Sequence, residues 1–143
     1  MSRLNVALFI ILAIMAMNSP CVNARPKTYV HIINGLVAKY VLNIHCYSRD
    51  DDLGHHTLPV SGHLDWSFGT SIFGNTVFKC DMNWAGGHGV FKVFWEDEQL
   101  QRKCHFNNCI WLAAIDGLYV KDLRINRFVF MYPWQKYLIK LPK

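Results

Sequence analysis

The sequence has no apolar run long enough to cross a lipid bilayer. Its longest mainly apolar segment, from Leu4 to Met17, is shorter than the roughly 20 residues that a membrane-spanning helix needs. Charged residues are scarce as well, at 17% of the chain, and the net charge is only +5. That charge is far below the basicity of a dedicated nucleic-acid binder. We therefore expect neither a membrane-spanning protein nor a nucleic-acid partner.

The apolar segment near the N-terminus has the layout of a secretory signal peptide. Arg3 precedes it, and Val22 and Ala24 supply the small residues that a signal peptidase site needs. We therefore predict a signal peptide over residues 1–24 and one mature domain over residues 25–143, secreted to the extracellular space. A buried N-terminal helix or strand is the alternative interpretation.

Cysteine is also infrequent, with five in the chain. Cys21 falls within the predicted signal peptide, and the other four are Cys46, Cys80, Cys104 and Cys109. An even number of cysteines in an oxidising compartment favours two disulfides over a zinc site. Three pairings are possible, and the sequence alone does not choose among them. We favour Cys46–Cys109 with Cys80–Cys104, because Cys46 and Cys80 both lie on apolar faces of predicted strands and each could cross a core.

Apolar and polar residues alternate along most of the chain, which is typical of antiparallel strands with one buried face. The alternation is found at 42–46, 63–68, 78–84 and 91–95, and further strands are expected at 28–33, 109–115 and 124–131. Asn-Gly, Gly-Gly and Asp-Gly dipeptides between these segments favour tight turns. We predict an all-β fold, a small antiparallel β-sandwich of about seven or eight strands in one domain.

A set of short motifs lies along the same segments. In chain order they are Asp50-Asp51-Asp52-Leu53-Gly54, Trp66-Ser67-Phe68, Phe78-Lys79-Cys80 with Trp84, Cys104 and Cys109 with Ile110-Trp111, and Asp116-Gly117-Leu118-Tyr119. This ordered set resembles the plant self-incompatibility S1 family, the S-protein homologues, from about Tyr29 to Trp134. The resemblance implies a small secreted β-sandwich with two disulfides, no known catalytic site, and a role as an extracellular protein ligand. We expect no cofactor.

The expected function is therefore that of a secreted, non-enzymatic plant protein. It would act as a monomeric extracellular ligand of a cell-surface receptor, in cell–cell recognition or signalling such as self-incompatibility (pollen rejection). A secreted defence or toxic protein that acts on microbial walls or membranes is the alternative. An enzyme is not expected. The phrases of a T2-type ribonuclease are missing, because His88-Gly89 is followed by Val90-Phe91 and no Lys-His pair exists.

The candidate partner-binding residues lie in one predicted loop, from Arg49 to His56. Its charged and titratable members are Arg49, Asp50, Asp51, Asp52, His55 and His56. Three consecutive aspartates fan apart and lack the spacing of an EF-hand, so we expect a solvated recognition loop and no metal site. Loops on a rigid scaffold are where binding specificity usually resides. A second candidate loop runs from Gly86 to His88.

The segment from Lys121 to Lys143 holds six basic residues and one acidic residue, Asp122. Tyr132, Trp134 and Tyr137 lie among them. Basic and aromatic residues together are typical of a surface that binds an acidic cell-wall polysaccharide, an anionic membrane or an acidic receptor. A last strand followed by a solvated tail is the alternative.

Overall fold

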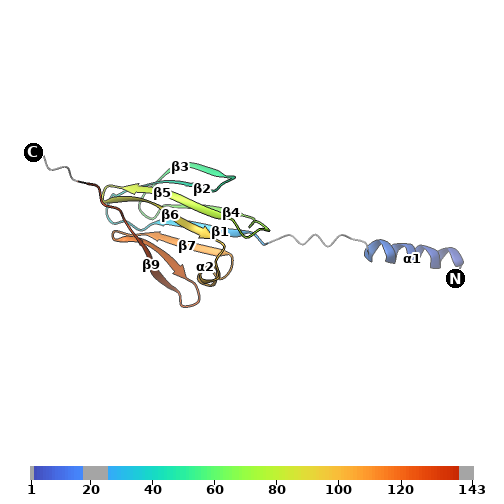
Figure 1. The fold of residues 1–143 in the computed structure, drawn as a ribbon. Coiled ribbons are helices and arrows are strands. Elements are labelled where there is room, and N and C mark those ends of the chain that lie inside the picture. The colour runs from blue at the N-terminus through green and yellow to red at the C-terminus, as the bar shows by residue number, and fades with distance from the viewer. Residues whose placement is uncertain (1, 18–25, 139–143) are drawn as a thin grey trace, which may run out of the picture.

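The computed structural model describes residues 2–17 and 26–138. Within these residues, nine strands form two sheets that pack face to face (Figure 1). The first sheet has the spatial order β4 (His63–Phe68), β1 (Thr28–Asn34), β7 (Asn108–Ala113), β8 (Gly117–Asp122) and β9 (Arg127–Pro133). The second has the order β3 (Asp52–Leu58), β2 (Leu42–Tyr47), β5 (Val77–Trp84) and β6 (Gly87–Trp95). The helices are α1 (Arg3–Met17) and α2 (Glu98–Lys103).

Alternation along the strands explains why the sheets face each other. In β5, Phe78, Cys80 and Met82 are buried, whereas Lys79 and Asp81 between them are exposed. The same alternation is seen in β1, β2 and β7, and the buried faces meet in one core. The prediction of an all-β sandwich is therefore confirmed.

Trp111 is the largest fully buried side chain of this core. Its indole Nε1–H donates a hydrogen bond to the carbonyl oxygen of Val93 at 2.8 Å. Trp111 lies on β7 in the first sheet and Val93 on β6 in the second, so this bond joins the two sheets. It also satisfies a polar group that would be costly to leave unpaired in an apolar core.

The predicted loop from Arg49 to His56 is in part a strand. Residues from Asp52 onward form the edge strand β3. Both β3 and β8 lie outside the strand ranges expected from the sequence. Asp, Gly and His are poor strand formers, but β2 supplies β3 with a ladder partner from Leu42 to Tyr47. The pairing is irregular at Gly54, whose φ of +74° is easily adopted by glycine.

The first sheet is mixed, although the sequence predicts an antiparallel sandwich. β1 runs parallel to β7, with Val30 opposite Cys109 and Ile32 opposite Trp111. A tight hairpin would force neighbouring strands to be antiparallel. Five strands and α2 separate β1 from β7 in the chain, so no short connection restricts their relative direction.

The disulfide pairing that we favour from the sequence, Cys46–Cys109 with Cys80–Cys104, is wrong. Cys46 bonds to Cys80, and Cys104 bonds to Cys109. Cys46 and Cys80 do lie on apolar strand faces, but β2 and β5 are neighbours in one sheet and place their Cα atoms 4.0 Å apart. The Cα atoms of Cys104 and Cys109 are 4.4 Å apart, because α2 ends and β7 begins within these few residues.

The helix α1 lies apart from the sandwich (Figure 1). Its side chains are exposed, with Leu4 at 80% and Phe9 at 71%, so α1 contributes nothing to the core. Among the described residues, no helix is both long and apolar enough to cross a membrane. Cys21 and the predicted cleavage site after Ala24 lie outside the described residues, and the signal peptide stays a prediction.

Removing the disulfides one at a time should give unequal losses of stability. Cys46 and Cys80 are 34 positions apart, whereas Cys104 and Cys109 are only 5 apart. A disulfide that closes a longer loop removes more entropy from the unfolded chain. The Cys46→Ala/Cys80→Ala variant should therefore lose about 1.5 kcal/mol more free energy of unfolding than Cys104→Ala/Cys109→Ala. Chemical denaturation of both variants measures this difference, and equal losses would contradict the chain-entropy explanation.

Asp122 is a buried carboxylate whose charge should stabilise the fold. Its side chain is 5% exposed, and Arg124 donates to both oxygens, from Nε at 3.0 Å and from Nη2 at 2.6 Å. These hydrogen bonds hold the pKa of Asp122 below its ordinary value of 3.8. The stabilisation is therefore complete above about pH 3.8 and is lost as the pH falls through the lowered pKa of the folded state.

The Asp122→Asn substitution should lower the melting temperature by a few degrees near pH 7 because it removes this ion pair. The difference from the parent protein should narrow as the pH falls below about 3.8, where the parent also loses its charge. Thermal melts at a series of pH values measure both effects. Asp51→Asn, at an exposed position, serves as the control and should change little. If the difference in melting temperature between Asp122→Asn and the parent did not change with pH, the Asp122–Arg124 ion pair would not be the cause of the stabilisation.

Candidate functional site

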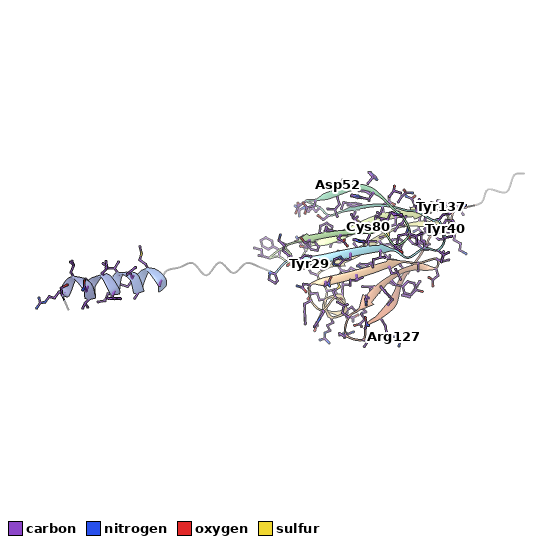
Figure 2. The ribbon with its side chains drawn as sticks, turned by 180° about the vertical axis from the view of Figure 1, so that it is seen from behind. Tyr29, Tyr40, Asp52, Cys80, Arg127 and Tyr137 are labelled. Carbon is purple, nitrogen blue, oxygen red and sulfur yellow. A yellow bond between two sulfur atoms is a disulfide. The ribbon has the colours of Figure 1, made fainter. Side chains whose placement is uncertain are left out.

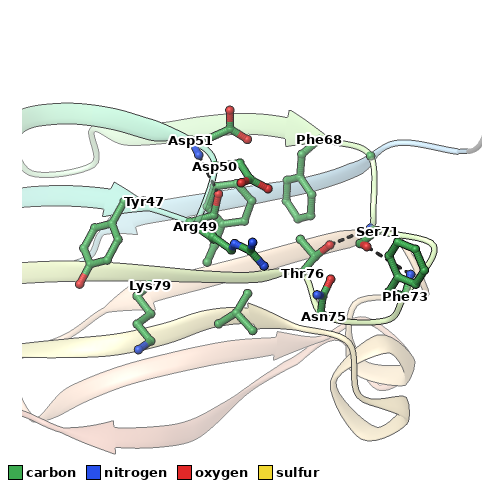
Figure 3. Close-up of a pocket in the computed structure, with 14 residues that line it drawn as sticks. Tyr47, Arg49, Asp50, Asp51, Phe68, Ser71, Phe73, Asn75, Thr76 and Lys79 are labelled. Carbon is green, nitrogen blue, oxygen red and sulfur yellow. Dashed lines mark hydrogen bonds between the residues drawn. The ribbon is translucent and has the colours of Figure 1, made fainter.

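A cleft of about 650 Å³ opens at the end of the sandwich where β1 begins (Figure 3). The β2–β3 and β4–β5 connections border it, and the first residues of β5 form part of its wall. Phe68 and Phe78 lie at its base, with ring centroids 4.5 Å apart. The cleft thus has an aromatic base that belongs to the packed part of the molecule and a border made of loops.

The β2–β3 connection is a tight turn held by Ser48. The Ser48 N–H donates to the carbonyl oxygen of Asp51 at 2.7 Å, and the Asp51 N–H donates to the Ser48 hydroxyl at 3.1 Å. Serine and aspartate favour such turns because their short side chains bind nearby backbone groups. The turn exposes Arg49 and Asp50, and Figure 3 shows the Arg49 side chain reaching across the cleft toward Thr76 and Asn75.

The β4–β5 loop is ordered by hydrogen bonds at both ends. The Ser71 N–H donates to the Thr76 hydroxyl at 2.7 Å, and the Thr76 N–H donates to Glu96 Oε2 at 3.2 Å. Gly74, with φ of +68°, closes a turn in which its own N–H donates to the Ser71 carbonyl oxygen. The loop therefore has a defined shape even though most of it is exposed.

This ordered loop presents two apolar side chains to solvent. Ile72 is 66% exposed and Phe73 is 82% exposed. Phe73 lines the cleft, and Figure 3 shows it at the end away from Tyr47. Large aromatic side chains are usually buried, and an exposed one in an ordered loop is typical of a contact point for a partner.

Charged groups around the cleft lack intramolecular partners. Among the described residues, the side chains of Arg49, Asp50, Asp51 and Lys79 form no ion pair. Charge of both signs therefore surrounds an aromatic base. Such a combination, a few polar groups around apolar surface, can recognise a partner by charge and by burial of its aromatic rings.

Comparison with known proteins assigns the chain to a family. A sequence profile described as plant self-incompatibility protein S1 matches residues 29–134. The chain belongs to the plant self-incompatibility S1 family. The matched segment includes both disulfides and all of the cleft residues named above.

Individual S1-family proteins support the same assignment. S-protein homolog 1 of Arabidopsis thaliana is 39% identical over 106 residues, which are 74% of this chain and 70% of that protein. S-protein homolog 29 of the same plant is 31% identical over 133 residues, 93% of this chain and 96% of that one. A solved structure of self-incompatibility protein homologues, described as small, highly stable, secreted plant proteins, covers 80% of this chain and 94% of its own. Its TM-score of 0.52 at 15% identity indicates a shared fold.

The predicted recognition loop of this S1-family protein is divided by the structure. Arg49, Asp50 and Asp51 border the cleft, whereas His55 and His56 lie on β3 with Asp52. The predicted loop therefore supplies residues to one side of the cleft, and the rest of it belongs to the edge strand. Whether these residues bind a partner stays a prediction.

Asp52 and its histidine neighbours shape the edge strand. Asp52 Oδ1 accepts hydrogen bonds from the Gly54 N–H at 2.8 Å and from His45 Nε2 at 2.7 Å. These two contacts, the first more than the second, lower the pKa of Asp52. The His55 ring lies 4.2 Å from that of His45, and His56 Nε2 donates to the Leu53 carbonyl at 2.7 Å.

The β4–β5 loop is the part of the site that sequence reasoning misses. Its Gly74-Asn75 dipeptide predicts only a turn, and nothing marks Ile72 and Phe73 as exposed. Their position is the one signal of an unusual loop, because these two large apolar residues lie between turn-forming residues and outside any alternating strand pattern. Burial and exposure of such residues depend on the rest of the fold.

The second candidate loop is not part of the cleft. Gly87 and His88 belong to β6, and the His88 N–H donates to the Gln135 carbonyl at 2.9 Å. Gly87 also packs closely on Trp134, whose side chain would lie 2.6 Å from an added Cβ atom. This segment therefore covers the core at the other end of the strands.

The described part of the C-terminal segment extends over more than one part of the sandwich. Figure 2 places Arg127 and Tyr137 at separate parts of the sandwich. Trp134 is buried, and its Nε1–H donates to the Ala114 carbonyl at 2.7 Å, so this ring belongs to the core. Lys140 and Lys143 lie outside the described residues.

The Thr76→Val substitution should loosen the β4–β5 loop without unfolding the protein. It removes the hydroxyl that accepts from the Ser71 N–H. Loss of one hydrogen bond of about 1 kcal/mol should accelerate hydrogen exchange at the Ser71 amide about five-fold. Thr57→Val is the matched control, because the Thr57 hydroxyl donates to Asn43 Oδ1 on the outer face of the second sheet. Equal exchange at Ser71 in all three proteins would contradict the role of Thr76.

Proposed function

We propose that this protein is a secreted, non-enzymatic extracellular ligand in cell–cell recognition or signalling, as in self-incompatibility. It acts by presenting the cleft to a cell-surface receptor. Membership of the S1 family supports this role, and the solved relative is described as a secreted plant protein. The apolar helix α1 outside the sandwich agrees with a signal peptide that is removed on secretion.

The observation that carries the proposal is the exposed ring of Phe73 beside unpaired charges. Phe73 is 82% exposed on a loop that hydrogen bonds hold in place. Aromatic and arginine side chains contribute most of the binding energy at protein interfaces, and Phe73 and Arg49 line the same cleft. A receptor side chain that enters the cleft would contact both residues and remove the ring from water.

Pre-organisation supports the same role. The Cys46–Cys80 disulfide joins the strands next to the cleft, and the Ser48 and Thr76 hydrogen bonds order the two loops. An ordered surface loses less conformational freedom on binding than a flexible one. Recognition by such a surface needs no chemical step, as the proposed role of a ligand requires.

Binding of labelled, oxidised protein to plant plasma membranes tests the proposal. We expect saturable binding to pollen or other plant membranes. The Phe73→Ser variant should bind at least about 30-fold more weakly. This factor corresponds to a loss of about 2 kcal/mol of binding free energy, which is typical when a central interface residue is truncated. Arg49→Glu should weaken binding as well.

Val37→Ser is the matched control. Val37 is 58% exposed in the β1–β2 connection, outside the cleft, and its replacement should leave binding unchanged. Equal binding of Phe73→Ser and the parent would place the receptor contact elsewhere. Failure to crosslink any saturable protein partner would overturn the ligand proposal. Inhibition of microbial growth without such a partner would instead favour a defence protein that acts on microbial walls or membranes.

A further inference from the structure

Basic and exposed apolar side chains gather where α2 meets the β8–β9 turn. The Leu123 N–H donates to the Lys103 carbonyl at 2.9 Å, which joins the end of α2 to the turn. We name this region the α2–β9 surface and define it by Lys103, Phe106, Lys121, Arg124, Ile125, Arg127 and Phe128. It lies at the end of the sandwich where β1 begins, since Asn108 at the start of β7 is opposite Tyr29.

The apolar members of this surface are held outward by the backbone. Phe106 is 69% exposed, Ile125 is 58% exposed and Phe128 is 40% exposed. Phe106 lies in the loop that the Cys104–Cys109 disulfide closes, with φ of +74°, and Asn126 next to Ile125 has φ of +52°. Positive φ is uncommon for phenylalanine and persists where the surrounding structure imposes it, whereas asparagine adopts it readily in turns.

The basic members are largely free of acidic partners. Asp122 neutralises Arg124 through two hydrogen bonds. Among the described residues, Lys103, Lys121 and Arg127 form no ion pair. Lys121 Nζ lies 5.7 Å from the centroid of the Phe128 ring, so a cation and an apolar ring occupy the same place.

The acidic side of the molecule lies away from this surface. Figure 2 shows Arg127 and Asp52 on opposite sides of the sandwich. Asp50, Asp51 and Asp52 are consecutive at the β2–β3 turn, so their negative charge is concentrated there. Closer to the α2–β9 surface, Asp122 is paired with Arg124 and Glu98 is paired with Arg102, so these two carboxylates form no ion pair with Lys121 or Arg127.

We propose that the α2–β9 surface docks on an anionic lipid surface. Lysine and arginine side chains attract anionic headgroups, and apolar side chains between them enter the boundary between headgroups and acyl chains. Charge complementarity alone would suit a soluble polyanion equally. The rings of Phe106 and Phe128 could stack on a sugar or enter a lipid interface. Ile125 favours the lipid, because an aliphatic side chain offers a polysaccharide no ring to stack on but gains an apolar environment in a lipid interface.

Membrane docking by the α2–β9 surface would assist the proposed contact between the cleft and a receptor, but it does not require that contact. The cleft and the α2–β9 surface lie at the same end of the sandwich. A protein held on the membrane by one surface would keep the other near the same membrane. Confinement of this kind raises the effective concentration of the ligand for a membrane receptor.

Co-sedimentation of the oxidised protein with lipid vesicles tests the proposal. We expect binding to phosphatidylcholine vesicles that contain about 30% phosphatidylserine, little binding to pure phosphatidylcholine, and loss of binding at high salt. Lys121→Glu/Arg127→Glu should reduce the partition coefficient more than about ten-fold. Phe106→Ser/Ile125→Ser should reduce it several-fold, since it removes the inserted apolar groups.

Lys39→Glu/Lys136→Glu is the control for charge. It makes the same change in net charge at exposed residues outside the α2–β9 surface, and it should retain binding. Thermal melts of each variant exclude misfolding as the cause of a loss.

Three outcomes would overturn the proposal. One is the absence of binding to anionic vesicles, and a second is an equal loss in the two charge variants. The third is binding to soluble polygalacturonate that is as tight as binding to anionic vesicles and that the Phe106→Ser/Ile125→Ser variant retains in full. That result would indicate a polysaccharide partner. None of these assays involves Phe73 or a receptor, so their failure is distinct from failure of the proposed function.

Discussion

The burial of alternate side chains between the two sheets determines where every loop of this protein lies. Phe78, Met82 and Trp111 are almost completely removed from water, and the Trp111–Val93 hydrogen bond links the sheets at the centre of the core. Apolar burial is the main favourable contribution to folding, and it requires each strand to keep its register, since a shift by one residue would expose the core face. The ends of the strands, and hence the loops, follow from that requirement.

Local bonds then give these loops a defined shape. The Cys104–Cys109 disulfide closes the segment before β7, whereas hydrogen bonds to Ser48 and Thr76 order the two loops beside the cleft. Exposed apolar residues would be a liability in a flexible loop, because they would collapse onto any apolar surface. In ordered loops, Phe73 and Phe106 remain available to a partner. The sandwich and the bonds within its loops therefore together keep these apolar residues exposed.

The two surfaces differ in the chemistry that they offer. The cleft combines an aromatic base with charge of both signs, as suits a specific protein contact. The α2–β9 surface combines unpaired cations with apolar side chains, as suits an extended anionic interface. A ligand of a membrane receptor would benefit from both, since one surface supplies specificity and the other supplies retention at the membrane.

The sequence by itself determined the features that depend on local pattern. Alternation of apolar residues predicted the all-β class, the four cysteines outside the predicted signal peptide predicted two disulfides, and the order of short motifs predicted the S1 family. The charged loop predicted from Arg49 to His56 includes three residues that line the cleft, Arg49, Asp50 and Asp51. Each of these inferences uses short local patterns or their order along the chain, and none requires knowing which distant residues meet.

Only the tertiary structure decided which distant residues meet. Cys46 and Cys80 pair because β2 and β5 are neighbours, and β3 forms because β2 has a free edge to which it can bind. Exposure of Phe73 and burial of Trp134 depend in the same way on what packs nearby. Pairing of strands far apart in the chain is selected by the energy of the whole core, and no local segment contains that information.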